Sequence, residues 1–217
     1  IIITGGATRI GAAIARSLSG INKDIVIHYN KSKLKAENLK KELIKTGSKV
    51  YLVKGDLGKE KDVNKIVKFA KSKLKYFDCL INNASIFEND KLENFNSRSW
   101  EKHLSINLKA PAILSREFGK NIKGKNNNII NIIDQRVFKL TPFFFSYTLS
   151  KTGLYTLTKT SAMSLAPRVR VNGIAPGPTI KNKRQSKGHF RRQYLSTLLK
   201  KQVDLSLIHI SEPTRQP

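Results

Sequence analysis

The chain has 217 residues, 39% of them hydrophobic, which is enough to bury the core of one globular domain. Its apolar runs, such as residues 129–133, are far shorter than the roughly 20 residues of a membrane span, so we expect a soluble protein. The formal net charge of +26 raises nucleic acid or an anionic membrane as a partner. Most basic residues are lysines, however, many of them on expected helix faces, and a lysine-rich composition bias accounts for the charge without either partner.

Apolar segments of strand length alternate with amphipathic segments of helix length, a pattern typical of strand–helix–strand units in a parallel sheet. We expect strands at residues 1–4, 24–29, 49–54, 78–82, 128–133 and 169–174. Helices are expected at residues 11–19, 32–46, 61–74, 98–122 and 146–165. In the second helix, Leu34, Leu39, Leu43 and Ile44 are predicted to pack inward. The predicted fold class is therefore α/β, a doubly wound parallel sheet covered on both faces.

The two ends of the chain depart from this pattern. No methionine opens the sequence, and residues 205–215 resemble the conceptual translation of a sequencing adapter. We therefore expect a fragment truncated at both ends, with one domain over residues 1–204 and a non-native tail over residues 205–217. The only cysteine, Cys79, lies in an apolar segment, which favours a reducing, cytoplasmic compartment.

A glycine-rich turn at residues 4–11 (TGGATRIG) separates the first strand from the first helix. Glycines in such a turn let the backbone approach a pyrophosphate held at the helix N-terminus. Further motifs follow in order: Asp56-Leu57, Asn82-Asn83-Ala84, Asn107, Tyr147-x-x-x-Lys151 and Pro176-Gly177. Together they resemble the short-chain dehydrogenase/reductase family over about residues 1–180. The resemblance implies a Rossmann-like oxidoreductase that forms homodimers or homotetramers through its two long helices.

The end of the second strand indicates which dinucleotide is bound. It reads His28-Tyr29-Asn30-Lys31-Ser32 and lacks the carboxylate that would hold the ribose hydroxyls of NAD. Lys31 and Ser32 offer a cation and a hydroxyl to a 2′-phosphate, so NADP(H) is the expected cofactor. With the resemblance, the expected cofactor-binding residues are Gly5, Thr8, Arg9, Ile10, Gly11, His28, Tyr29, Asn30, Lys31, Ser32, Asp56, Leu57, Asn83, Ala84, Ser85, Tyr147, Lys151, Pro176, Gly177 and Thr179.

Tyr147 and Lys151 are four residues apart and share one helix face, where the ammonium would lower the pKa of the phenol. Tyr147 is therefore the expected acid, and Asn107 matches the family asparagine that kinks a helix and completes a proton path to the lysine. Asp134 stands thirteen residues before Tyr147, where the family usually has a serine. A carboxyl group there suits a substrate with ring nitrogens; the alternative is a weak or inactive paralogue.

Three further residues resemble one branch of the family, the pteridine and dihydromonapterin reductases. Arg9 replaces a loop glycine, while Ser85 and Phe87 follow Asn82-Asn83-Ala84. In that branch the arginine reaches cofactor phosphate and pterin, and the aromatic ring stacks on the pterin. The resemblance implies a substrate of the dihydrobiopterin, dihydromonapterin or dihydrofolate class, held by Arg9, Ser85, Phe87, Asp134 and Tyr147. The alternative assigns Arg9 to the helix surface and Phe87 to the core.

Two other functions stay open on the sequence. One is a general carbonyl or 3-oxoacyl thioester reductase of the same family. The other, motivated by the charge, is a nucleotide-sensing or nucleic-acid-binding protein that keeps the fold. The basic segment within residues 178–201, where the family carries its substrate lid, either steers an acidic substrate tail or continues the lysine bias, and His189 and Phe190 are placed at the pocket. No His or Cys cluster has metal-ligand spacing, so no catalytic metal is expected.

Overall fold

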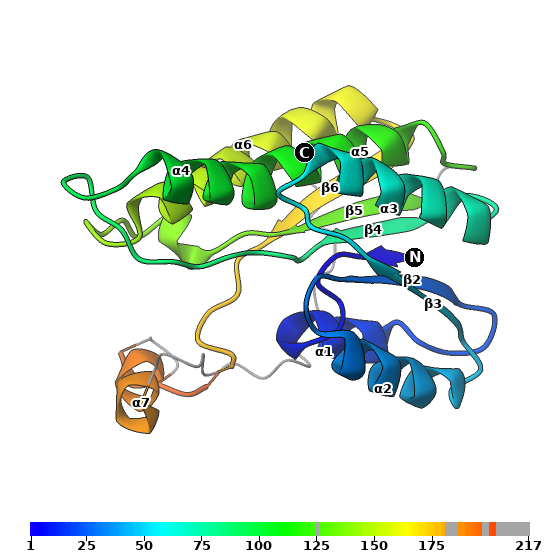
Figure 1. Cartoon of the computed structure of the whole chain (residues 1–217), viewed down its shortest axis with the longest axis horizontal. Helices are drawn as coiled ribbons and strands as arrows, with labels where there is room; N and C mark the ends of the chain where they lie inside the picture. The colour runs from blue at the N-terminus through cyan, green and yellow to red at the C-terminus, as the bar shows by residue number, and fades with distance from the viewer. Residues whose placement is uncertain (125, 181–185, 197–199, 203–217) are drawn as a thin grey trace.

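The computed structural model describes residues 1–124, 126–180, 186–196 and 200–202. Its centre is a six-stranded sheet in the order β3-β2-β1-β4-β5-β6, in which every neighbouring pair is parallel (Figure 1). The strands are β1 (Ile2–Ile3), β2 (Asp24–Tyr29), β3 (Lys49–Lys54), β4 (Cys79–Asn82), β5 (Asn127–Ile132) and β6 (Val169–Ile174). The predicted doubly wound α/β fold is confirmed.

Helices cover both faces of this sheet. On one face lie α1 (Arg9–Ser17) and α2 (Lys33–Ile44) (Figure 1). On the other lie α3 (Glu60–Lys73), α4 (Ser97–Leu104), α5 (Ala110–Gly119) and α6 (Phe145–Leu165) (Figure 1). The π-helical turn η1 (Ser105–Lys109) lies between α4 and α5. The 3-10 turn η2 (Gln135–Val137) follows β5, and α7 (Lys187–Leu195) follows β6.

The strands are rich in apolar residues because successive residues of one strand face opposite helical layers. Ile2 and Val26 belong to the core beneath α3 and α5, whereas Ile3 and Ile27 belong to the core beneath α1 and α2. All four side chains are buried. Each layer of helices is therefore attached to the sheet by its own apolar cluster.

Two helix predictions need correction. Leu34 and Ile44, predicted to pack inward, are exposed, and the buried stripe of α2 is Ala36, Leu39 and Leu43. These three positions follow the i, i+3, i+7 spacing of one helix face, and Leu34 lies off that face. The single helix predicted over residues 98–122 is divided into α4 and α5 by the π turn η1.

The order of the strands determines where a ligand can bind. The strand order reverses between β1 and β4: β2 and β3 lie on one side of β1, and β4, β5 and β6 lie on the other. Ligands of open α/β folds bind beyond the carboxyl ends of the strands at such a point. The glycine-rich turn follows β1 and the Asn82-Asn83-Ala84 motif follows β4. The two motifs therefore lie side by side.

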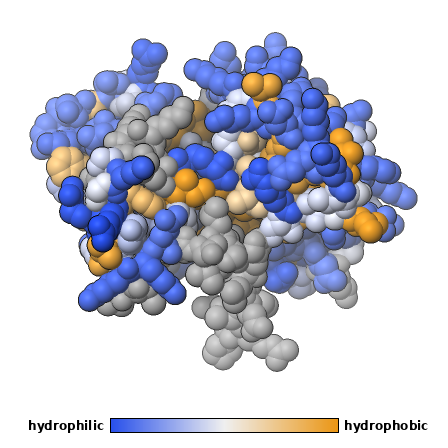
Figure 2. Space-filling model, turned by 90° about the horizontal axis from the view of Figure 1, so that it is seen from below, coloured by the Kyte–Doolittle hydropathy of each residue, from blue (hydrophilic) through white to orange (hydrophobic). Residues whose placement is uncertain are grey.

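The surface carries the excess of basic residues. Seen from the side of α1 and α2, hydrophilic side chains cover much of the molecule (Figure 2). Within the described ranges, no helix has both the length and the hydropathy required to cross a membrane. The predicted tail, residues 205–217, lies outside the described residues, so the boundary of the domain at residue 204 stays a prediction.

Candidate active site

Tyr147 and Lys151 lie one turn apart near the start of α6, and both side chains are buried. The Tyr147 hydroxyl donates a hydrogen bond to Oδ2 of Asp134 at 2.6 Å. The Lys151 ammonium donates to the carbonyl oxygen of Ile132 at 2.8 Å, and its Nζ lies 5.9 Å from the centroid of the Tyr147 ring. The structure thus brings together the phenol, ammonium and carboxyl groups that the sequence predicted to converge.

The protonation of this group differs from the prediction. Burial raises the pKa of Tyr147 well above its ordinary value, and the neighbouring Asp134 carboxylate raises it further. The expected lowering of the phenol pKa by Lys151 is therefore wrong for this structure, because the hydroxyl faces a carboxylate and the ammonium lies beside the ring. Tyr147 is a protonated phenol at neutral pH, which is the form that can donate a proton.

Lys151 titrates in a range relevant to activity. Burial lowers the pKa of its ammonium to about 8, although the Asp134 carboxylate acts in the opposite direction. A lysine with this pKa is still mostly protonated at neutral pH and loses its charge in mildly alkaline solution. It supplies a positive charge beside the Tyr147–Asp134 pair.

Asn107 lies in the π turn between α4 and α5, where π turns frequently mark functional sites. Its side chain is fully buried. The Oδ1 atom accepts hydrogen bonds from the Ile86 amide and the Ser85 hydroxyl, and Nδ2 donates to the Ile86 carbonyl and to Ser150 Oγ. The predicted irregularity of the helix is present, and Asn107 joins the segment after β4 to α6. Its predicted place in a proton path stays a prediction.

The glycine-rich turn is packed too tightly for side chains. A Cβ atom at Gly11 would lie 2.3 Å from the Gly5 carbonyl oxygen, and Gly5 itself has φ of +59°. Asn83 Nδ2 donates to the carbonyl oxygens of Thr4 and Gly5 at 2.9 and 3.1 Å. The turn is thus fastened to the segment after β4, and its backbone is open to close approach at the N-terminus of α1.

His28, predicted to bind the cofactor, supports this turn instead. Its ring is buried, Nδ1 accepts from the Gly5 amide at 3.1 Å, and Nε2 donates to the Gly55 carbonyl at 3.1 Å. Burial lowers the pKa of the imidazole, so the ring is neutral. The predicted contact of His28 with a cofactor phosphate is wrong, because both ring nitrogens are already bonded to backbone. The buried side chain of Tyr29 likewise belongs to the core.

Other predicted cofactor residues stand in accessible places. Asn30 and Lys31 are exposed and Ser32 is half-buried, directly before α2. Asp56 is half-buried and its Oδ1 accepts from the Gly58 amide at 3.0 Å, whereas Leu57 is part of the core. Half-buried positions include Thr8, Ile10, Ala84, Pro176 and Gly177, and Thr179 is buried.

Arg9 bridges two parts of the site. It begins α1 with a φ of +53°, and its guanidinium donates to the carbonyl oxygen of Ile180 at 3.0 Å. This bond connects the glycine-rich turn to the segment after β6, where the predicted lid begins. Ser85, in the segment after β4, is exposed, and its hydroxyl donates to Asn107 Oδ1 at 3.2 Å.

Phe87 lies at the centre of an aromatic cluster beside Tyr147. Its ring stacks on Phe144, with 4.2 Å between centroids and 6° between planes, and meets the Tyr147 ring edge-on at 4.6 Å. The Arg136 guanidinium lies 4.5 Å from the Phe144 centroid. The sequence analysis missed Phe144 and Arg136. Phe144 lies three residues before Tyr147, and Arg136 lies two residues after Asp134. This closeness in sequence to the predicted catalytic residues could have indicated both of them.

The predicted lid, residues 178–201, is described only in part. Residues 181–185 and 197–199, and the side chain of His189, lie outside the described residues. Phe190 is buried in α7 and its ring contacts Tyr194 at 5.6 Å between centroids. Across the part of the chain that the structure describes, no three His, Cys, Asp or Glu side chains group as metal ligands would.

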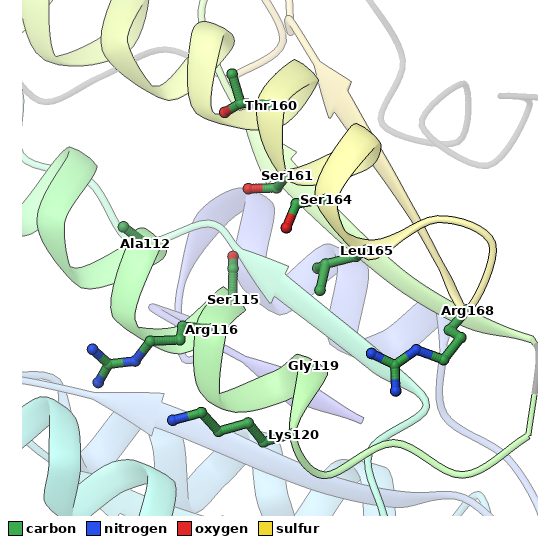
Figure 3. A pocket seen from close by; sticks show the side chains of 10 residues that line it. All are labelled: Ala112, Ser115, Arg116, Gly119, Lys120, Thr160, Ser161, Ser164, Leu165 and Arg168. Carbon is green, nitrogen blue, oxygen red and sulfur yellow. The ribbon is translucent and has the colours of Figure 1, made fainter.

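A cavity of about 430 Å³ opens elsewhere, between α5 and α6 (Figure 3). Hydroxyls of Ser115, Ser161 and Ser164 line it, and Arg116 and Arg168 lie at its edges (Figure 3). Its residues on α6 begin at Thr160, thirteen positions beyond Tyr147, which is about 20 Å along a helix. This cavity is separate from the candidate active site.

Comparison with known proteins agrees with this geometry. Residues 1–191 match the family model of the short chain dehydrogenases. The chain is 31% identical over 179 residues to a short-chain dehydrogenase/reductase, FrzI, of Cladobotryum sp., covering 82% of this chain and 69% of that protein. It is 28% identical over 178 residues to the 3-oxoacyl-acyl-carrier-protein reductase FabG of Staphylococcus epidermidis, covering 81% of this chain and 73% of that protein.

Solved structures with the same fold include two with a bound dinucleotide. FolM alternative dihydrofolate reductase 1 from Brucella canis, complexed with NADP, superposes with a TM-score of 0.88 at 41% identity, covering 94% of this chain and 81% of that chain. A blue fluorescent protein from a metagenomic library, in complex with NADPH, has a TM-score of 0.88 at 27% identity, covering 95% of this chain and 85% of that chain.

Proposed function

Because the chain belongs to the short-chain dehydrogenase family, we propose that it is an NADPH-dependent reductase whose substrate is a dihydropterin of the dihydrobiopterin, dihydromonapterin or dihydrofolate class. The observation that carries the proposal is the hydrogen bond from Tyr147 to Asp134 at 2.6 Å. A ketone oxygen needs only a hydroxyl donor, whereas a dihydropterin presents ring nitrogens and N–H groups. A carboxyl group beside a protonated phenol can serve both kinds of group.

The cofactor assignment rests on the turn after β1 and the end of β2. The close packing at Gly5 and Gly11 leaves backbone, without side chains, at the start of α1, which suits a pyrophosphate. Lys31 and Ser32 are accessible to a 2′-phosphate, and no carboxylate stands between His28 and Ser32. Relatives in complex with NADP or NADPH support the same assignment. When bound, NADPH supplies the hydride.

The chain's own residues deliver the proton. Tyr147 holds a proton on Oη because burial and Asp134 raise its pKa, and it passes this proton to a ring nitrogen of the substrate. The negative charge left on the pair is stabilised by the ammonium of Lys151, which is buried beside them. Phe87, which stacks on Phe144 and meets Tyr147 edge-on, would contact the planar substrate together with Ser85 and Arg9.

The similar proteins include a dihydrofolate reductase and a 3-oxoacyl-acyl-carrier-protein reductase, so the assay must separate these two kinds of substrate. We expect purified protein to oxidise NADPH with dihydrobiopterin or dihydrofolate at a higher kcat/KM than with an acetoacetyl thioester. The variant Asp134→Ser should lose dihydropterin reduction while gaining relative activity toward the thioester, since it restores a hydroxyl donor. Turnover of the thioester alone by the unmodified protein would contradict the dihydropterin assignment.

The second candidate, a 3-oxoacyl or other carbonyl reductase, is favoured by the likeness to the FabG reductase. We also propose that the protein works as a homodimer or homotetramer in the cytoplasm. Small side chains of α5 and α6 beside the cavity, the half-buried Ala112 and Ser161 and the exposed Ser164, would let helices of a second copy approach closely. Light scattering of the purified protein tests the oligomeric state.

A further inference from the structure

The start of α6, which carries Tyr147, is capped by a different part of the chain. Its N-cap residue, Phe144, makes no side-chain cap and has φ of +60°. The first amide groups of a helix have no partner within the helix and must find one elsewhere. Here the Phe144 amide donates to Oδ1 of Asn89 at 3.1 Å, and the Phe145 amide donates to the carbonyl oxygen of Asp90 at 3.2 Å.

Asp90 completes this cap with its carboxylate. Oδ1 accepts from the Ser146 amide at 3.0 Å, while Oδ2 accepts from the Ser146 hydroxyl and, at 3.1 Å, from the Ser99 hydroxyl. The Asp90 side chain is buried, and a negative charge at a helix N-terminus is stabilised by the helix dipole. A buried carboxylate that accepts three hydrogen bonds is fixed in orientation, and it restricts the movement of the residues that donate to it.

His103 of α4 determines the direction of the hydrogen bonds. Nε2 must accept, because the Glu88 amide donates to it at 3.2 Å. Nδ1 therefore carries the proton and donates to Ser146 Oγ at 2.7 Å, which leaves the serine hydrogen for Asp90. The imidazole is fully buried, and burial lowers its pKa, in agreement with a neutral ring.

This chain of bonds connects two neighbours of the candidate active site. Glu88 directly follows Phe87, and Ser146 directly precedes Tyr147. The Phe87 and Tyr147 rings themselves meet edge-on at 4.6 Å, but no hydrogen bond is available between them. One polar connection between the two segments therefore runs from the Glu88 amide through His103 to Ser146, which Asp90 holds in place, and a second runs from Ile86 through Asn107 and Ser150 to the Tyr147 carbonyl.

We propose that Asp90, His103 and Ser146 form a positioning unit that fixes Tyr147 of α6 against Asp134 and Phe87. None of the three touches the reacting atoms, since all are buried behind the site. Their effect is on geometry: a displacement of about 1 Å of a proton donor can cost up to about 100-fold in rate. This inference deepens the proposed function and rests on it where turnover is measured.

The test is a double-mutant cycle on Asp90→Ala and Ser146→Ala, with Thr158→Val as the matched control. Thr158 is a buried hydroxyl of the same helix, bonded to Leu154 and Asn131, and stands twelve residues beyond Ser146. For each variant, NADPH oxidation is measured with dihydrobiopterin or dihydrofolate, whichever gives the higher kcat/KM. Thermal unfolding and the absorbance titration of the Tyr147 phenol are measured as well, with Tyr147→Phe as the blank.

We expect each single variant to lower kcat about tenfold with KM changed less than about twofold, and the double variant to be no worse than the poorer single. The Tyr147 pKa should fall in Ser146→Ala, because a displaced ring is less shielded from water. Thr158→Val should lose thermal stability while keeping both kcat and the phenol titration.

Two results would overturn the proposal: rate losses that multiply in the double variant, or a Thr158→Val variant that reproduces those losses. The phenol titration needs no substrate. If neither substrate is reduced, the proposed function fails, yet an unchanged titration in Ser146→Ala would still refute the positioning unit and a coupled shift would still support it.

Discussion

The two carboxylate oxygens of Asp134 are bound to different partners: Oδ1 accepts from the Arg136 amide at 2.9 Å, and Oδ2 accepts from the Tyr147 hydroxyl at 2.6 Å. The first bond caps the short turn η2 and fixes the carboxylate to the backbone. The second aligns the phenol. Tyr147 thus receives its orientation from a side chain that is itself held by main chain, which is the arrangement expected of a rigid proton donor.

Asp134→Asn should lower kcat for dihydropterin reduction by about 100-fold with little change in KM. Its amide would keep the Arg136 bond through Oδ1 but would present a donor, not an acceptor, to the Tyr147 hydroxyl. General acid catalysis contributes about 10²- to 10⁴-fold, so the lower end of that range is the expected loss. Steady-state kinetics measures it, with Asp24→Asn in β2 as the control; equal losses in both variants would contradict the role of Asp134.

Activity should depend on the charge of Lys151. Its pKa of about 8 means that the ammonium is present below that pH and is lost above it. We therefore expect kcat/KM to fall as pH rises through about 8. Lys151→Arg should shift the fall to higher pH, because a guanidinium stays protonated. A pH–rate profile of both proteins measures this, and a profile that is flat between pH 7 and pH 9.5 would refute it.

Burial of the Lys151 ammonium should also lower the free energy of unfolding. Burial lowers the Lys151 pKa from its ordinary value of 10.5 to about 8, so between these values the unfolded chain binds more protons. Stability contributed at this position is therefore lowest below pH 8 and rises toward pH 10.5. Lys151→Met should raise the free energy of unfolding at pH 7 by about 2 kcal/mol, after the lost bond to Ile132 is subtracted, while abolishing activity.

Denaturant unfolding at pH 7 and pH 9 measures this effect. The gain from Lys151→Met should be smaller at pH 9 than at pH 7, since the wild-type lysine is mostly neutral there. A methionine variant less stable than the unmodified protein at pH 7 would show that the ammonium is a net stabiliser.

Substitutions at Lys31 and at His28 should affect the binding of NADPH and NADH differently. Lys31→Glu is expected to weaken NADPH binding by about 10- to 100-fold and to leave NADH binding unchanged or improved, because it replaces a cation with an acidic group. His28→Ala should weaken both cofactors equally and lower the melting temperature, since His28 supports Gly5 and Gly55. Fluorescence titration with the two dinucleotides tests both, and selective loss of NADPH in His28→Ala would restore the original phosphate-binding prediction.

The sequence alone determined the fold and most of the motif positions. Strand-length runs of Ile and Val predicted buried parallel strands, because such strands are apolar on both faces, and the bounds of all six expected strands lie within one residue of the observed ones. The helical stripe of α2 was misjudged because spacing does not reveal which face of a helix meets the sheet. The family resemblance placed the glycine turn, Tyr147 and Lys151 in the correct order.

Tertiary structure decided what each of those groups can do. Local spacing put Lys151 near Tyr147, but the phenol pKa depends on burial and on Asp134, which reaches Tyr147 from another element. His28 changed from a cofactor ligand to a support for Gly5, because β1 and β2 are neighbours in the sheet. The cap of α6 by Asn89 and Asp90 spans more than fifty residues of sequence. Hydrogen bonds and desolvation act through space, so only the folded chain could reveal them.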